Sequence, residues 1–153
     1  MAQTIAQRAA PTGSPLVDHT QLRFNQACII VFVALAFILD LPWVVAAVAL
    51  VLALGTAYPP LGLFQQIYRQ WLRPAGLLTP DLRSEDSAPH RFAQGMGAGV
   101  LVLASVAFAL GAAALGWGLG LVVVVLAAVN LFFGFCAGCF VFFQIQRLRA
   151  RAS

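Results

Sequence analysis

The sequence has very little charge for its length. Charged residues make up 9% of the 153 positions, whereas hydrophobic residues make up 61% and the mean hydropathy is +0.90. A soluble domain typically carries about a quarter charged residues. So few charges could not cover this much apolar surface in water, which excludes an ordinary soluble fold. The composition is that of a chain solvated by lipid.

Lysine is absent, and the positive charge comes from nine arginines. These arginines flank apolar runs and do not gather with aromatic residues into one basic patch, so we expect no binding to nucleic acid. Cationic residues in such positions hold a membrane protein against anionic headgroups. The predicted partner is therefore the lipid bilayer. The arginines are Arg8, Arg23, Arg69, Arg73, Arg83, Arg91, Arg147, Arg149 and Arg151.

Cysteine is also scarce. The three cysteines, Cys28, Cys136 and Cys139, all lie in apolar stretches, which excludes a disulfide-rich secreted scaffold. We do not expect a signal peptide, because residues 1–26 contain no basic cluster that leads directly into a short apolar run. Residues 1–15 are predicted to form a disordered tail.

The apolar runs predict an all-α membrane protein with four transmembrane helices arranged as two hairpins. A spanning helix needs about 20 residues, and about 17 is a working minimum. The predicted spans are residues 24–41, 43–58, 92–115 and 119–143, with tight turns at Asp40–Trp43 and Gly116–Gly118. Together they form one transmembrane domain over residues 16–148, followed by a basic tail at 149–153.

The segment between the second and third spans has another character. In residues 61–73, apolar side chains recur at helical spacing on one side, while Gln65, Gln66, Arg69 and Arg73 occupy the other. This pattern is typical of an amphipathic helix that lies in the membrane interface. Residues 74–90 are rich in proline and acidic residues and are predicted to form a loop.

The distribution of arginine predicts the orientation of the chain. All nine arginines lie in the N-terminal segment, in the loop between spans two and three, or in the C-terminal tail. The two short turns contain none. Under the positive-inside rule, both termini and the central loop face the cytoplasm. We therefore expect a multi-pass protein of a cytoplasmic membrane, without a soluble catalytic domain on either face.

One motif carries chemistry, namely Cys136-Ala-Gly-Cys139 in the predicted fourth span. At positions i and i+3 of a helix, the two sulfurs face the same side and can come close. Such a pair could form a disulfide, hold a soft metal ion or carry a persulfide, so Cys136 and Cys139 are the candidate catalytic dithiol. Cys28, near the cytoplasmic start of the first span, is expected at a similar depth and is a third candidate thiol.

Packing is the alternative role for the pair. A redox dithiol usually lies at a helix N-terminus, where the dipole favours the thiolate. This pair is instead predicted deep in a helix among phenylalanines, where apolar burial disfavours the thiolate. Gly134 and Gly138 form a small-xxx-small pair that lets helices approach closely, and cysteine is itself small. The residues alone leave both roles open.

We predict no metal site and no cofactor. His19 and His90 are assigned to segments that border the membrane, so neither is expected at the depth of the cysteines. An iron–sulfur cluster would need a fourth thiolate. Buried ionisable residues near a span centre, which mark coupled transporters, are also missing. Asn130 is the most central polar residue, and its expected role is a hydrogen bond between helices.

A polar collar is predicted at the cytoplasmic mouth of the bundle. Its residues border spans one, three and four. The collar could anchor lipid headgroups, or bind an anionic sulfur compound or a thiol-bearing partner above the cysteines. It consists of Arg23, Asn25, Gln26, Arg91, Gln94 and Gln144.

Several segments in a fixed order resemble a known family. VDHTQLRFNQ precedes the first span, YRQWLRPAGLL and PHRFAQG lie in the central loop, and FGFCAGCFVFF lies in the last span. This order resembles the bacterial membrane family catalogued as domain of unknown function 4395, over about residues 17–147. The resemblance implies a bacterial inner-membrane protein of four helices with a cysteine pair in the last. Members occur near genes for thioredoxin-like or sulfurtransferase proteins, which favours thiol or sulfur chemistry.

Two functions from different classes follow. In the first, the protein is a membrane thiol/disulfide or sulfur-relay protein. Cys136 and Cys139 then serve a cytoplasmic thioredoxin-like or sulfurtransferase partner, and Cys28 resolves or regulates. In the alternative, it is a non-catalytic membrane scaffold or assembly subunit in which the cysteines only pack. The sequence leaves open whether the protein is an enzyme and whether it forms oligomers.

Overall fold

The structure is a computed structural model that describes residues 16–152, and the predicted tail at 1–15 lies outside these residues. The described chain is mostly helical, with one pair of short strands. Its elements in chain order are β1 (Leu16–Asp18), α2 (His19–Ile38), α3 (Pro42–Ala57), η2 (Pro59–Leu61), α4 (Leu63–Ile67), η3 (Tyr68–Leu72), β2 (Leu82–Ser84), α5 (Ala88–Ala109), α6 (Ala113–Phe133) and α7 (Ala137–Ala152).

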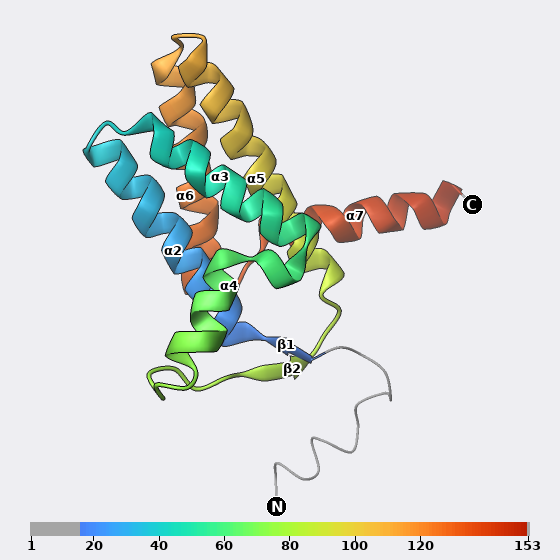
Figure 1. Cartoon of the computed structure of the whole chain (residues 1–153). Coiled ribbons are helices and arrows are strands. Elements are labelled where there is room, and N and C mark those ends of the chain that lie inside the picture. The colour runs from blue at the N-terminus through green and yellow to red at the C-terminus, as the bar shows by residue number, and fades with distance from the viewer. Residues whose placement is uncertain (1–15, 153) are drawn as a thin grey trace, which may run out of the picture.

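Four long helices, α2, α3, α5 and α6, form a bundle (Figure 1). Helix α2 packs against α3 and α6, and α5 packs against the same two helices, so the four are arranged around a shared core. Small and branched apolar side chains fill this core and let the helix axes approach closely. The most deeply buried include Val33, Val45, Ala49, Leu52, Leu101 and Ala104.

The outer surface of the bundle is apolar as well. Large hydrophobic side chains such as Phe32, Leu50, Leu103 and Val125 are exposed. A soluble monomer rarely exposes extended apolar surface of this kind. Helices α2, α5 and α6 are long and apolar enough to cross a membrane, and α3 is an apolar helix of 16 residues. Three helices thus have the length and composition of a membrane span, as expected of a membrane protein, while the claim of four crossings stays a prediction.

The second hairpin turns earlier than the sequence predicts. The predicted turn at Gly116–Gly118 is wrong, because these residues lie inside α6. The chain turns between Ala109 and Ala113, where Gly111 adopts a positive φ of 80°. The ring of Phe108 occupies the space beside Gly116, at 2.6 Å from where a Cβ would be. Gly116 therefore serves close packing across the hairpin rather than a change of direction.

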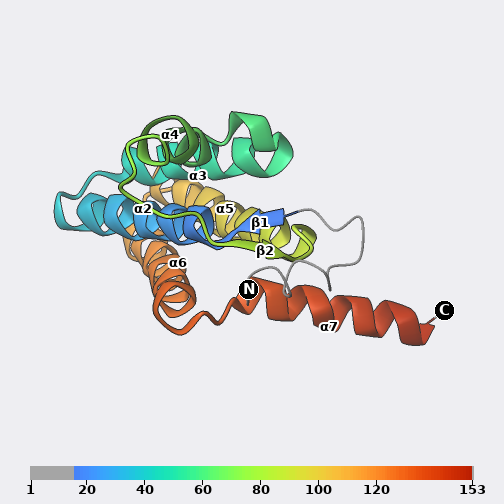
Figure 2. The same cartoon turned by 90° about the horizontal axis from the view of Figure 1, so that it is seen from below.

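The predicted fourth span at 119–143 is also wrong as one continuous helix. Helix α6 ends at Phe133, and Gly134 follows in the left-handed conformation with φ 68°. A glycine in this conformation is a common way to end a helix. Helix α7 begins at Ala137 and runs crosswise to α6, away from the base of the bundle (Figures 1 and 2). It continues to Ala152, through most of the predicted basic tail.

The segment between α3 and β2 contains three short helical pieces rather than one helix over 61–73. They are η2, α4 and the π-helix η3. Phe64 stacks on Phe32 with ring centroids 5.8 Å apart, and Tyr68 lies 6.1 Å from Phe24. The apolar side of this segment therefore packs on α2. A position in the membrane interface stays a prediction.

A two-stranded antiparallel sheet, which the sequence pattern does not predict, connects the start of α2 to the central loop. Its register pairs Leu16 with Ser84 and Asp18 with Leu82. The backbone N–H of His19 then donates to the carbonyl of Asp81 over 2.8 Å. The strands thereby bring the loop before α5 alongside the N-terminus of α2.

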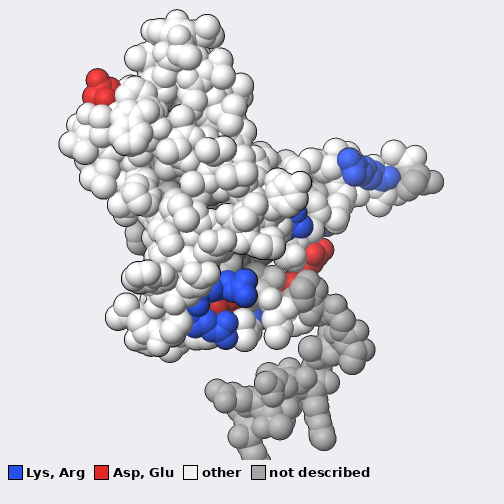
Figure 3. All heavy atoms as spheres, in the orientation of Figure 1, with Lys and Arg blue, Asp and Glu red and all other residues white. Residues whose placement is uncertain are grey.

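Charge gathers at this end of the molecule. In Figure 3 the upper part of the bundle is almost free of charged side chains, whereas arginines lie around the strands and on α7. Asp40 lies away from this end, in the turn between α2 and α3. The fold therefore has a long apolar bundle and a polar end built from the strands, the starts of α2 and α5, and α7. We call this the polar end.

Candidate functional site

The two cysteines lie at the start of a helix, not deep within one as the sequence predicted. Cys136 directly precedes α7, and its carbonyl accepts the N–H of Phe140 over 3.0 Å in the first turn. Its sulfur accepts the backbone N–H of Cys139 over 3.3 Å. This is the position of a helix N-cap, where free N–H groups and the helix dipole favour a negative charge. The break after Gly134 creates this position.

The environment shifts the pKa values of the two thiols in opposite directions. A hydrogen bond with the Cys139 side chain, together with the backbone N–H groups of Cys139 and Gly138, lowers the pKa of Cys136 to about 6 against the opposing effect of burial. The same hydrogen bond and the partial burial of the thiol raise the pKa of Cys139. Cys136 is thus the thiolate of the pair, and Cys139 keeps its proton. A lowered pKa in a half-buried setting is typical of a reactive cysteine.

His90 lies next to the pair, contrary to the prediction from the sequence. Its Nδ1 is 3.7 Å from the sulfur of Cys139. The premise that no histidine reaches the cysteines is therefore wrong. A straight fourth span would keep the cysteines away from His90, but α7 turns across the base of the bundle to the level where α5 begins. An imidazole at this distance can exchange a proton with the thiol.

His90 also belongs to a chain of polar groups that continues away from the cysteines. Its Nε2 lies 3.6 Å from Oε2 of Glu85, and Nε2 of His19 lies 3.1 Å from the same oxygen. Burial acts to raise the pKa of Glu85, but the hydrogen bonds and charges of the two histidines outweigh it and hold the pKa below its ordinary value. Glu85 is therefore an anionic acceptor between two imidazoles.

Gly138 makes the contact between α7 and α5 possible. A Cβ at this position would lie 2.5 Å from Cβ and 2.6 Å from Cα of Ala93. No side chain fits there unless one helix moves. Since Ala93 lies one turn after His90, this close approach sets the distance between Cys139 and His90. Gly134 and Gly138 are thus not a pair on one helix, as the sequence suggested, but a helix stop and a helix contact.

Two cavities adjoin Cys136. The smaller, of about 100 Å³, is lined by polar residues from α2 and α5 and includes four members of the predicted collar. These four are Arg23, Asn25, Gln26 and Gln94, and His19, His90 and Asn130 line the same cavity. The larger, of about 290 Å³, extends from Cys136 into the bundle between apolar side chains such as Ile29 and Val123. Cys136 can therefore be reached both from a polar and from an apolar side.

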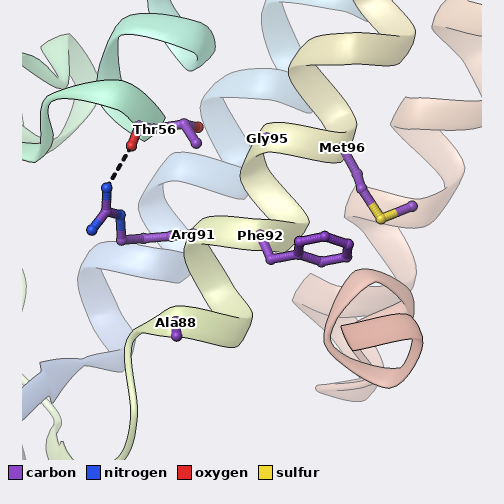
Figure 4. A pocket seen from close by; sticks show the side chains of 6 residues that line it. All are labelled: Thr56, Ala88, Arg91, Phe92, Gly95 and Met96. Carbon is purple, nitrogen blue, oxygen red and sulfur yellow. Dashed lines mark hydrogen bonds between the residues drawn. The ribbon is translucent and has the colours of Figure 1, made fainter. Parts of the chain in front are cut away.

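The remaining collar residues lie elsewhere. Arg91 donates to the carbonyl of Thr56 over 2.8 Å at the end of α3, beside an open hollow of about 470 Å³ on the outside of the bundle (Figure 4). Gln144 lies on α7, beyond the residues that line the cavities. Four of the six residues of the predicted polar collar therefore lie beside the dithiol, on α2 and α5.

Cys28 is separate from the pair in the part of the chain that the structure describes. It is half-buried on α2 and packs against the apolar core of the bundle. The residues that line the two cavities at Cys136 do not include it. The structure therefore does not bring Cys28 together with the dithiol in the way that the sequence predicted.

A family model described as Domain of unknown function (DUF4395) matches residues 17–147. No curated protein and no solved structure matches the chain. The matched range contains β1 except for its first residue, β2, the four bundle helices and the first two-thirds of α7. It therefore includes every residue of the site described above.

Proposed function

The chain belongs to the family described as Domain of unknown function (DUF4395), and since that description names no activity, we propose from its geometry that it is a membrane thiol–disulfide exchange protein. The observation that carries the proposal is the placement of Cys136 at the start of α7. There its sulfur accepts a backbone N–H, and Cys139 follows three residues later. This arrangement gives one reactive thiolate and one resolving thiol on the same helix turn.

In the reducing direction, the Cys136 thiolate attacks one sulfur of a partner's disulfide. A bond forms between Cys136 and that sulfur, the partner's disulfide breaks, and its other sulfur leaves as a thiolate. Cys139 then gives its proton to this departing thiolate, beside His90, whose Nδ1 lies 3.7 Å from the Cys139 sulfur. Its thiolate attacks the sulfur of Cys136, which releases the partner's second thiolate. Two electrons thus pass from the dithiol to the partner, and the reverse sequence oxidises a partner dithiol.

The partner we propose is a cytoplasmic thioredoxin-like or sulfurtransferase protein that approaches the polar end. Arginines at this end and on α7 supply the charge that would attract an acidic surface (Figure 3). The positive-inside rule supports a position in a bacterial inner membrane in which this end, and with it both termini, faces the cytoplasm. With a sulfurtransferase, Cys136 would displace a thiolate from a persulfide and keep the terminal sulfur.

The test is thiol trapping in cells that carry wild-type protein or single serine variants. Cells are treated with a thiol oxidant, quenched in acid and labelled with a mass-shifting maleimide. We expect the wild type and Cys28→Ser to lose two labels after oxidation. Cys139→Ser should accumulate a mixed disulfide at Cys136, and Cys136→Ser should not. Cys28→Ser is the matched control, since it removes a half-buried thiol outside the site.

The scaffold alternative gives a different pattern. If Cys136 and Cys139 still take up both labels after oxidation, and if untreated protein is labelled there only once it is denatured, they are packing residues. The proposal is then refuted. A gain of one sulfur atom at Cys136, seen by mass, would identify a persulfide and assign the partner to the sulfurtransferase class.

A further inference from the structure

Three potential metal ligands meet beside the dithiol. One ring nitrogen of His19, one carboxylate oxygen of Glu85 and one ring nitrogen of His90 all lie within 4.8 Å of one another. Glu85 lies between the two imidazoles, with oxygen–nitrogen distances of 3.1 Å and 3.6 Å. The two rings are nearly perpendicular at 82°, with centroids 6.0 Å apart.

The backbone holds these three residues in place. His19 is the first residue of α2, and its N–H donates to Asp81 across the strand pair. Glu85 directly follows β2, and His90 lies in the first turn of α5. The three ligands thus come from elements whose ends are fixed by hydrogen bonds, so little ordering would accompany the binding of an ion.

The two contacts of Glu85 with the imidazoles fit the coordination shell of a small divalent cation. Zinc binds histidine nitrogen and carboxylate oxygen at about 2.0–2.2 Å in tetrahedral geometry, which places neighbouring ligand atoms about 3.3–3.6 Å apart. Both oxygen–nitrogen distances at Glu85 lie within about 0.2 Å of this range. The side chains are 22–44% exposed, which leaves an entry path for the ion.

We propose that His19, Glu85 and His90 bind a zinc ion, with water in the fourth position. Two histidines and one glutamate form a ligand set that zinc uses where one position stays open. Cys139 lies at Nδ1 of His90, whereas Nε2 faces Glu85. The thiol would therefore contact the outer nitrogen of a ligand rather than the ion, as groups that orient ligating histidines do.

The test uses full-length protein in detergent with Cys28, Cys136 and Cys139 all replaced by serine, so that thiols cannot bind the ion. Zinc affinity is measured by competition with a chromophoric chelator. We expect one zinc per chain, and a loss of affinity of at least about 100-fold in Glu85→Gln, since even the loss of a group that only orients a ligand costs 10–100-fold. Asp81→Asn is the matched control, because it removes a carboxylate from the same loop and should change the affinity by less than about twofold.

A second measurement needs no ligand variant. Cobalt should give the visible bands of a tetrahedral nitrogen–oxygen site, without a sulfur-to-metal charge-transfer band, in both wild-type and thiol-free protein. Equal affinity in Glu85→Gln and its parent, or a site that disappears with the cysteines, would overturn the proposal. Because the serine variant also abolishes thiol exchange, a failure of the zinc site and a failure of the proposed function give separate results.

Discussion

The apolar bundle and the polar end are held together in different ways. In the bundle, helices pack through small and branched apolar side chains, and polar groups such as Thr56 and Ser105 bond to carbonyls of their own helix. At the polar end, side chains from distant segments bond to one another, as Tyr68 does to Asp18 and His19 to Glu85. The bundle depends on shape and volume, and the polar end depends on individual atoms.

This difference relates the fold to the proposed chemistry. A packed apolar core tolerates exchanges that keep its total volume, so the bundle can serve as a support within the membrane. Its helices α2 and α5 both begin at the polar end, with His19 and His90 in their first turns. Two long helices thus bring two imidazoles to one place, and α7 crosses there with Cys136 and Cys139 at its start.

The largest expected effect comes from a close backbone contact between the two regions, that of Gly138 on α7 with Ala93 on α5. In Gly138→Ala, the new Cβ collides with Ala93, so α7 must move away from α5. We expect a loss of about 1–3 kcal/mol of stability, the usual cost of overpacking. In a Cys28→Ser/Cys136→Ser background, Cys139 should also be alkylated faster, because α5 no longer covers its thiol. Thermal unfolding in detergent and maleimide labelling measure the two effects.

Gly99→Ala is the control for this substitution. Gly99 lies on α5 within the bundle, and a Cβ there meets nothing within 4 Å. It should leave stability unchanged or raise it slightly, because alanine favours a helix by up to about 1 kcal/mol over glycine. If both variants are equally stable, the contact between α7 and α5 does not hold the site together.

A smaller, tenfold effect should appear when pH is varied. Because the pKa of Cys136 is lowered to about 6, its thiolate share should fall about tenfold between pH 7 and pH 5. In Cys28→Ser/Cys139→Ser, which leaves Cys136 as the single thiol, the maleimide rate should follow this curve. In Cys28→Ser/Cys139→Ala, the main hydrogen bond is lost, and the midpoint should move upward towards an ordinary thiol. A midpoint that is the same in both variants would show that Cys139 does not tune its neighbour.

The bundle could largely be predicted from the sequence, because long apolar runs must become helices in lipid. The positions of its breaks could not. Gly111 and Gly134 turn or end helices through a positive φ, whereas Gly116 and Gly138 allow close contacts, and all four stand in similar apolar surroundings. The residue type alone does not distinguish these roles.

The sequence predicts the dithiol of the candidate site but not the residues around it. The spacing of Cys136 and Cys139 identified the dithiol, but its chemistry depends on whether a helix begins at Cys136 or runs through it. His90 was placed near the membrane boundary, yet its contact with Cys139 requires that α7 turn across the bundle. Glu85 meets His19 because three-residue strands pair, and strands so short leave no alternating pattern to find.

The smallest effects concern Asp18, which connects the two regions. Its Oδ1 caps α2 by accepting the N–H groups of Thr20 and Gln21, and its Oδ2 accepts the hydroxyl of Tyr68 over 3.0 Å. Asp18→Ala loses both roles and should cost about 1–2 kcal/mol. Tyr68→Phe loses one hydrogen bond and should cost about 1 kcal/mol. Asp18→Asn keeps a capping oxygen and should cost less than either. Thermal unfolding at neutral pH gives this order.

An alkaline scan separates the hydrogen bond from the cap. Burial, followed by the bond to Asp18, raises the pKa of Tyr68, so its contribution is present below the ordinary value of 10.0 and is lost as pH rises through the higher folded value. Wild-type protein should therefore lose stability above pH 10 more steeply than Tyr68→Phe, while the capping contribution of Asp18 stays constant. If the two curves are parallel, Tyr68 contributes by packing alone. The link between the bundle and the polar end then depends on the cap and the strands.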